Sequence, residues 1–138
     1  QHPIQHHQIG QHRVDFEPMM AKLETVNAGD LVLIHGCCHN PCGADLSKEQ
    51  WEALTQLCER RGLVPFVDLA YQGFGDDLET DVAGLRLLAS RLPTLLLAIS
   101  CSKNFGLYRE RAGALAVVAE HAVAARAVGQ GTHRAREA

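Results

Sequence analysis

Apolar residues follow two different patterns along the chain. In three segments they recur every three or four positions, which is the spacing of an amphipathic helix. Ser47 and Gln50 have the spacing of a capping box, Gly62 is placed to end that helix, and Pro93 closes the next one. We therefore predict three helices, over Phe16–Val26, from Ser47 to Gly62, and over Val82–Arg91.

Between the helical segments lie short, unbroken apolar runs. Because Leu31–Ile34 does not alternate with polar residues, we expect it to be a strand buried on both faces. Strand and helix alternate, which is typical of an α/β fold with a mostly parallel sheet flanked by helices. No run approaches the ~20 residues needed to span a bilayer. The strands are predicted at Leu31–Ile34, Leu63–Leu69, Thr94–Ile99 and Ala114–Ala119.

Polar side chains gather where the predicted strands end. In parallel sheets, ligands bind beyond the carboxyl ends of the strands, so these side chains are expected to share one pocket. The first strand is followed by His39 and Asn40, the second by Asp68 and Tyr71, and the third by Ser100, Ser102 and Lys103.

Two of these residues could carry chemistry. A partly dry site would lower the pKa of Lys103 and free its amine as a nucleophile for Schiff-base formation. Asp68 closes an apolar strand and needs a cationic partner, which a protonated pyridine nitrogen would supply. The alternatives are a solvated loop lysine for Lys103, and a helix cap or an arginine ion pair for Asp68.

Four further residues are candidate ligands of the same group. Tyr71 and Asn40 could donate hydrogen bonds to a phenolate oxygen, and Ser100 with Arg111 could bind a phosphate. Taken singly, each has an ordinary explanation, such as packing for Tyr71 and turn formation for Asn40.

The five cysteines and the net charge argue against a disulfide-stabilised protein, a metal site and a surface that binds nucleic acid or membranes. Cys37 and Cys38 are adjacent, which suits no ordinary disulfide framework, so reduced and mostly buried thiols in a cytoplasmic protein are expected. These cysteines could bind zinc together with Cys42, His35 and His39, but the spacing matches no common ligand pattern, and no metal site is expected. The net charge of −3 offers no basic surface for nucleic acid or for a membrane.

Three motifs together resemble a known family. HGCCHNPCG at residues 35–43, DLAYQGF at 68–74 and SCSKNFGLYRER at 100–111 occur in the order and spacing of the class I (aspartate/aromatic-amino-acid) aminotransferases. Members of that family are fold-type I enzymes that use pyridoxal 5′-phosphate (PLP). The resemblance runs from about Val14 to about Gln130.

The resemblance implies a role for each candidate residue. Lys103 matches the catalytic lysine that holds the cofactor and moves the substrate proton. Asp68 matches the partner of the pyridine nitrogen, with His35 beside it, and Tyr71 and Asn40 match the donors to the 3′-oxygen.

Further implications concern the phosphate and the loop before it. Ser100 and Arg111 match the phosphate ligands, and the peptide bond between Asn40 and Pro41 is expected to be cis. Cys42 stands where relatives usually have Thr, a change expected to spare cofactor binding.

The resemblance also implies an incomplete chain. Residues 13–130 match part of the PLP-binding large domain, whereas the polar, His-rich residues 1–12 and the tail 131–138 do not resemble the family. The expected reaction transfers an amino group between an L-amino acid, aspartate or aromatic, and a 2-oxo acid such as 2-oxoglutarate. Full-length members are homodimers. The alternative is a non-catalytic remnant that binds PLP weakly or not at all.

Overall fold

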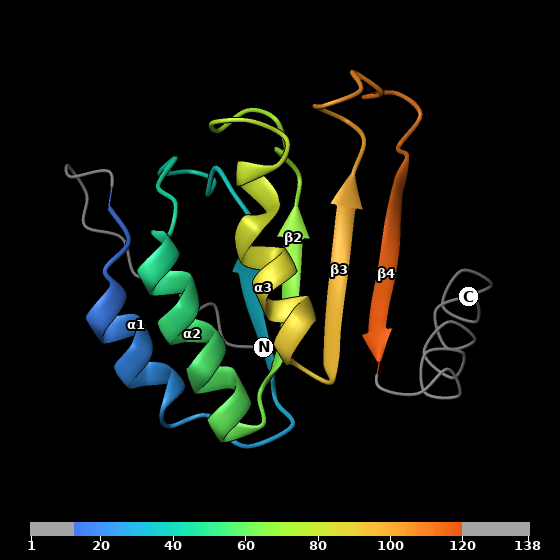
Figure 1. Cartoon of the computed structure of the whole chain (residues 1–138). Helices are drawn as coiled ribbons and strands as arrows, with labels where there is room; N and C mark the ends of the chain where they lie inside the picture. Colours follow the sequence, from blue (N-terminus) through green and yellow to red (C-terminus); the bar gives the residue numbers. More distant parts are fainter. Residues whose placement is uncertain (1–12, 120–138) are drawn as a thin grey trace.

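The computed structural model describes residues 13–119, so the predictions for residues 1–12 and 131–138 lie outside it. The predicted elements are confirmed, with ends that differ by up to three residues. None of the helices in this part of the chain is long and apolar enough to cross a membrane. In chain order (Figure 1) the elements are α1 (Phe16–Leu23), β1 (Leu31–His35), α2 (Lys48–Arg61), β2 (Val64–Leu69), the 3-10 turn η1 (Thr80–Val82), α3 (Ala83–Arg91), β3 (Thr94–Ser100) and β4 (Gly113–Ala119).

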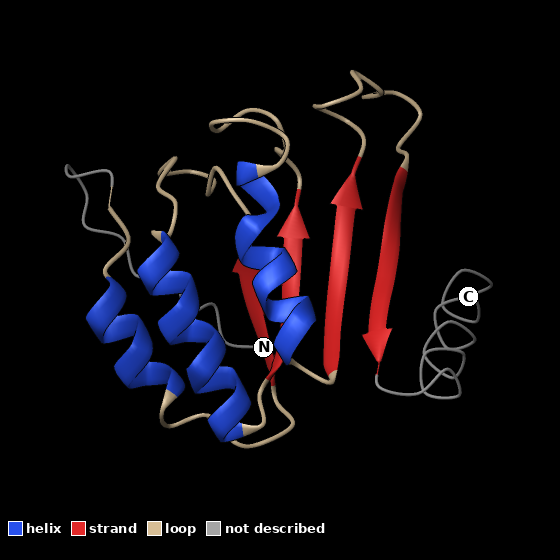
Figure 2. Cartoon of the chain, viewed as in Figure 1, coloured by secondary structure: helices blue, strands red, loops and turns tan. Residues whose placement is uncertain are grey.

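The four strands form one mixed sheet in the order β1-β2-β3-β4. β1, β2 and β3 are parallel, and β4 runs antiparallel to β3. All three helices lie on the same face of the sheet (Figure 2). For α2 and α3, which connect successive parallel strands, this placement follows from the strand order, because successive right-handed crossovers that advance in one direction put their helices on one side.

The core lies between the helices and the strand residues that point toward them. Its buried side chains are mostly aliphatic, with Met19, Cys58 and the single aromatic Trp51 among them, as the low aromatic content predicts. The fully buried members come from every layer, so the helices cannot separate from the sheet without exposing apolar surface. They include Leu23 of α1, Leu54 and Leu57 of α2, Leu88 of α3, Val32 of β1, Val67 of β2 and Leu95 of β3.

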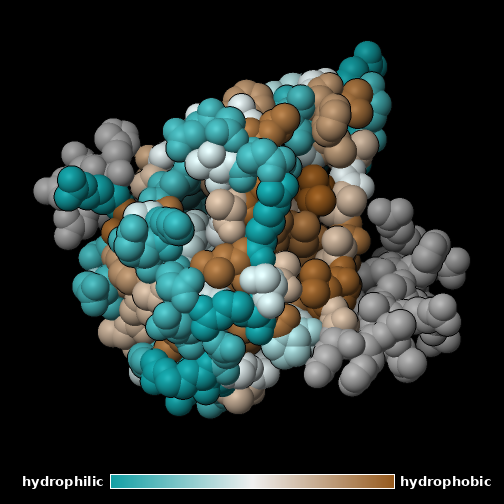
Figure 3. Space-filling model, viewed as in Figure 1, coloured by the Kyte–Doolittle hydropathy of each residue, from teal (hydrophilic) through white to brown (hydrophobic). Residues whose placement is uncertain are grey.

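The prediction that Leu31–Ile34 is buried on both faces is wrong for the described chain. Val32 and Ile34 are buried, but Leu31 is 46% exposed and Leu33 is 37% exposed. The reason is that the described helices cover a single face, so every second side chain of β1 points into solvent. Hydrophobic surface also remains over β3 and β4 beside α3 (Figure 3), where Val118 is exposed.

Local hydrogen bonds fix the position of α2. The Ser47 hydroxyl accepts from the Gln50 N–H at 3.2 Å, and the Gln50 side chain accepts from the Ser47 N–H at 2.9 Å, which confirms the predicted capping box. Gly62 ends the helix with φ +64°, a conformation that favours glycine. Arg91 of α3 forms an ion pair with Glu52, which ties the two helices together.

Gly84 provides a test of how α3 packs on α2. A Cβ atom at this position would lie 2.2 Å from two ring atoms of Trp51. Gly→Ala in a helix normally stabilises by about 1 kcal/mol, but overpacking costs about 1–3 kcal/mol. We therefore expect Gly84→Ala to lower the free energy of unfolding, measured by urea denaturation and circular dichroism.

A Trp51→Leu background is the matched control for this test. The smaller side chain makes room, so Gly84→Ala should cost much less there than in the wild-type chain. A stabilising effect of Gly84→Ala in the wild-type chain would contradict the packing described.

The cysteines are free, as the sequence predicts, but only two of the five are buried. Cys58 is a core residue of α2, and Cys37 packs with Leu69 and Val82 just after β1. Burial raises the pKa of Cys58 to about 11. Burial, followed by the neighbouring Cys38 and nearby carboxylates, raises the pKa of Cys37 to about 12.

These pKa values predict which thiols resist alkylation. The thiolate is the nucleophile, and with a pKa of about 12 roughly one in ten thousand Cys37 side chains is ionised at pH 8. Iodoacetamide should therefore modify the half-buried Cys101 well before Cys37 and Cys58, as read by peptide mass mapping. Reactivity of the buried pair should rise as the pH approaches 11. In urea all five should react alike, and early labelling of Cys37 in the native chain would contradict its described burial.

Candidate functional site

The carboxyl ends of three parallel strands meet at one edge of the sheet. In the register, His35 of β1 lies opposite Asp68 of β2, and Asp68 lies opposite Ala98 of β3. The Gly36 N–H donates to the Asp68 carbonyl oxygen at 2.8 Å, so the pairing continues past the end of β1. This edge therefore carries residues from all three predicted strand ends.

Asp68 lies on the sheet face that the helices do not cover. It alternates with the buried Val67 and Leu69, which point toward the helices, and is itself half-buried. Within residues 13–119 its carboxylate has neither an ion-pair nor a hydrogen-bond partner. The two structural alternatives considered for Asp68, a helix cap and an arginine ion pair, are thus absent from the described chain.

Lys103 and Tyr71 connect the loops that follow β2 and β3. The Lys103 ammonium nitrogen lies 4.4 Å from the centroid of the Tyr71 ring, which is cation–π geometry. Tyr71 also meets Phe74 edge to face, with ring centroids 6.5 Å apart. Both Lys103 and Tyr71 are half-buried, so the lysine is held against an aromatic face and is not a fully solvated loop residue.

The antiparallel pairing of β3 with β4 brings the backbone near Arg111 close to the backbone of Ser100. Ser100, the last residue of β3, lies opposite Gly113, and the Cys101 N–H donates to the Ala112 carbonyl at 3.1 Å. Arg111 immediately precedes this pairing and is exposed, with its backbone at φ +52°. The Ser100 hydroxyl accepts from the Ser102 N–H at 3.3 Å. A hydroxyl and a guanidinium group therefore come from neighbouring points of one hairpin.

The loop after β1 holds the two histidines. The His35 ring stacks on His39 with centroids 4.2 Å apart, and His39 Nδ1 lies 3.1 Å from the Cys42 thiol. The bond between Asn40 and Pro41 is cis, as the resemblance implied. Asn40 is exposed, and among the described residues no hydrogen bond joins its amide to the rest of the site.

Two polar residues of this region were not singled out from the sequence. The carboxylate of Asp81, which is buried, accepts from the N–H groups of Gly73, Gly75 and Asp76 at 2.7 to 3.0 Å and so holds the loop after β2. The side-chain oxygen of Asn104 is buried without a hydrogen-bond partner in the described structure. The glycines indicate a loop between residues 72 and 79, but nothing in the sequence marks the anchor that follows it.

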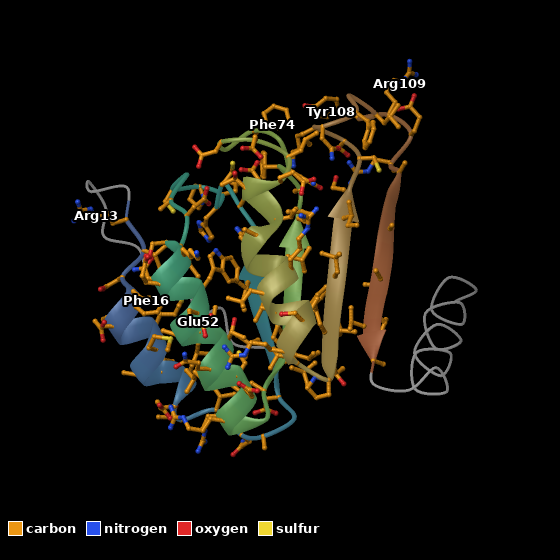
Figure 4. The ribbon with its side chains drawn as sticks, viewed as in Figure 1. Arg13, Phe16, Glu52, Phe74, Tyr108 and Arg109 are labelled. Carbon is orange, nitrogen blue, oxygen red and sulfur yellow. The ribbon has the colours of Figure 1, made fainter. Side chains whose placement is uncertain are left out.

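Large apolar side chains surround the same end of the molecule. Phe74 and Tyr108 lie over the loops beyond β2 and β3 (Figure 4). Phe74 is 60% exposed, Phe105 is 70% exposed, and Tyr108 is similarly open. The candidate site is thus bordered by an exposed aromatic rim.

Comparison with known proteins matches this arrangement to one family. The profile of the family described as aminotransferase class I and II matches residues 2–133. An aromatic-amino-acid aminotransferase of Paracoccus denitrificans is 56% identical over 118 residues, which are 86% of this chain and 30% of that protein. An aspartate aminotransferase of Escherichia coli is 51% identical over 108 residues, which are 78% of this chain and 27% of that protein.

Solved structures agree with the sequence comparison. The aromatic-amino-acid aminotransferase from Burkholderia pseudomallei, covalently bound to pyridoxal phosphate, superimposes with a TM-score of 0.81 at 42% identity, over 85% of this chain and 29% of that one. The chain therefore spans about 30% of the length of such relatives. From the matched profile and the shared fold, the chain belongs to the class I and II aminotransferase family.

Proposed function

We propose that the chain is part of a PLP-dependent transaminase. The reaction moves the amino group of an L-amino acid, aspartate or aromatic, to a 2-oxo acid such as 2-oxoglutarate. The observation that carries this proposal is the contact of Lys103 with Tyr71 at the sheet edge that also holds Asp68, whose carboxylate has no hydrogen-bond or ion-pair partner within residues 13–119. The relatives named for aromatic and aspartate substrates support the reaction class and leave both substrates open.

The residues at this edge fit the cofactor chemically. A half-buried carboxylate with no ion-pair partner among residues 13–119 favours a protonated pyridine nitrogen, so Asp68 would hold that end of the ring. The hydroxyl of Tyr71 and the amide of Asn40 would donate to the 3′-oxygen. Ser100 and Arg111, which come from one hairpin, would bind the phosphate. When bound, PLP supplies an electron sink for the substrate carbanion.

The remaining chemistry belongs to side chains of this chain. The Lys103 amine would hold the cofactor and then take the proton from the substrate Cα and return it at the cofactor C4′. The Tyr71 ring beneath the amine limits the directions in which the lysine can point. His35, which stacks on His39 and lies opposite Asp68, would act as a positioning residue for that carboxylate.

A second proposal concerns what the described chain does alone. One face of the sheet is open, with Leu31 and Leu33 exposed, and the aromatic rim of Phe74, Phe105 and Tyr108 is uncovered. Such surfaces are normally covered by further chain or by a partner. For the full-length protein we propose a homodimer, as the resemblance implies, and for this chain alone little or no turnover.

Lys103 provides the direct test of cofactor binding. The sequence contains three lysines, so two matched controls exist, Lys22→Ala and Lys48→Ala. Adding PLP should produce the visible absorbance band of lysine-bound cofactor, and borohydride reduction followed by peptide mapping should place the label on Lys103. Lys103→Ala should abolish the band while both controls keep it. Equal labelling of the three lysines would refute a dedicated site.

A transamination assay tests whether this chain is active alone or is an inactive part of the enzyme. The PLP-loaded chain, incubated with aspartate or phenylalanine and 2-oxoglutarate, should form no more glutamate than its Lys103→Ala variant does. Glutamate formation that depends on Lys103 would overturn the proposal that this chain is inactive, while it would support the proposed reaction.

A further inference from the structure

Three potential metal ligands converge where the loop after β1 meets the 3-10 turn η1. Cys37 and Cys38 follow β1, and Asp81 comes from η1, more than forty positions later in the sequence. The two thiol sulfurs and a carboxylate oxygen all lie within 4.8 Å of one another. Cys37 is 5% exposed and Asp81 is 8% exposed, while Cys38 is half-buried.

The backbone already holds these ligands in place. Cys37 and Cys38 are adjacent in the chain, and Cys38 has a left-handed backbone with φ +48°. The carboxylate of Asp81 is fixed by three backbone N–H groups, two on Oδ2 and one on Oδ1. Because a carboxylate can accept about four hydrogen bonds, one position on Oδ1 remains for a cation without loss of the loop anchor.

The surroundings favour a positive charge. A cavity of about 730 Å³ between α2 and α3 opens onto Cys37 and Asp81. Its lining includes Asp45, Glu49, Glu52, Asp76 and Asp81, and the cation among the lining residues is Lys48.

We propose that Cys37, Cys38 and Asp81 bind a thiophilic divalent cation of the Zn²⁺ class, with a water molecule from the cavity as fourth ligand. Two sulfurs and two oxygens meet the tetrahedral preference of zinc. Thiolate ligands select against Mg²⁺ and Ca²⁺. Binding replaces the two thiol protons, so two protons are released for each ion bound. This ligand set differs from the Cys/His pattern considered from the sequence, because the fold supplies Asp81.

The proposed metal ligands are not among the residues proposed to hold the cofactor. Lys103, Asp68 and Arg111 do not line the cavity that opens onto Cys37 and Asp81, although Tyr71 packs against the cluster that contains Cys37. Because no ligand is shared, cadmium binding and PLP binding are measured separately.

Cadmium provides the probe, because its thiolate complexes absorb in the ultraviolet. Titrating the 138-residue chain with Cd²⁺ should give a thiolate band that saturates at one ion per chain and that Zn²⁺ reverses. The band is specific to sulfur ligands, so the histidines of residues 1–12 do not contribute to it. The Cys37→Ser/Cys38→Ser double variant should lose the band, and Cys101→Ser should keep it. A band that survives in the double variant would overturn the proposal.

Variants of Asp81 test whether cadmium binds to the complete three-residue site or to the two thiols alone. Asp81→Asn keeps an oxygen for the loop N–H groups but loses the charge, and we expect at least about tenfold weaker Cd²⁺ binding. Asp76→Asn is the matched control, because Asp76 touches the site through its backbone N–H, and its effect should be much smaller. Equal affinity in Asp81→Asn and wild type would refute the site.

A second measurement decides the case in which Asp81→Asn fails to fold, as judged by circular dichroism. The ¹¹³Cd NMR shift of the wild-type chain reports the ligand atoms. A shift in the range of mixed sulfur and oxygen coordination supports the site, and a shift in the range of all-sulfur coordination overturns it.

Discussion

Parallel hydrogen bonding between β1, β2 and β3 is the constraint on which the proposed chemistry depends. It brings three strand ends to one edge of the sheet, so that His35, Asp68 and the loop carrying Lys103 become neighbours although the sequence separates them widely. Antiparallel β4 then returns beside β3 and places Gly113, two residues after Arg111, opposite Ser100. No single side chain determines this arrangement. It follows from strand register, which apolar packing against the helices maintains.

The same strand order leaves the sheet half covered. Because β1, β2 and β3 advance in one direction, their crossover helices lie on one face. Asp68 alternates with residues that point toward those helices and so lies on the other face. Asp68 and the exposed Leu31 and Leu33 therefore lie on the uncovered face of the sheet. This explains how a chain can have a well-packed core and a recognisable site while much of its apolar surface remains open.

The sequence predicts what local chemistry determines. Ser47 marks the start of α2, and Asp68 and Lys103 follow apolar runs, so their places at helix and strand ends could be predicted. The burial of each strand face could not be predicted in the same way. An apolar run such as that around Leu33 is compatible with a strand that is covered on one face or on both. The role of Asp81 was also out of reach, since its hydrogen bonds and its approach to the cysteines arise from the path of a loop.

A crystal structure of the chain after reduction with PLP would test the central claim most directly, namely that the converging strand ends form one pocket. The account predicts a pyridoxyl group on Lys103 whose ring nitrogen lies within about 3 Å of the Asp68 carboxylate. A ring attached to Lys103 but directed into solvent, with Asp68 out of its reach, would contradict the account.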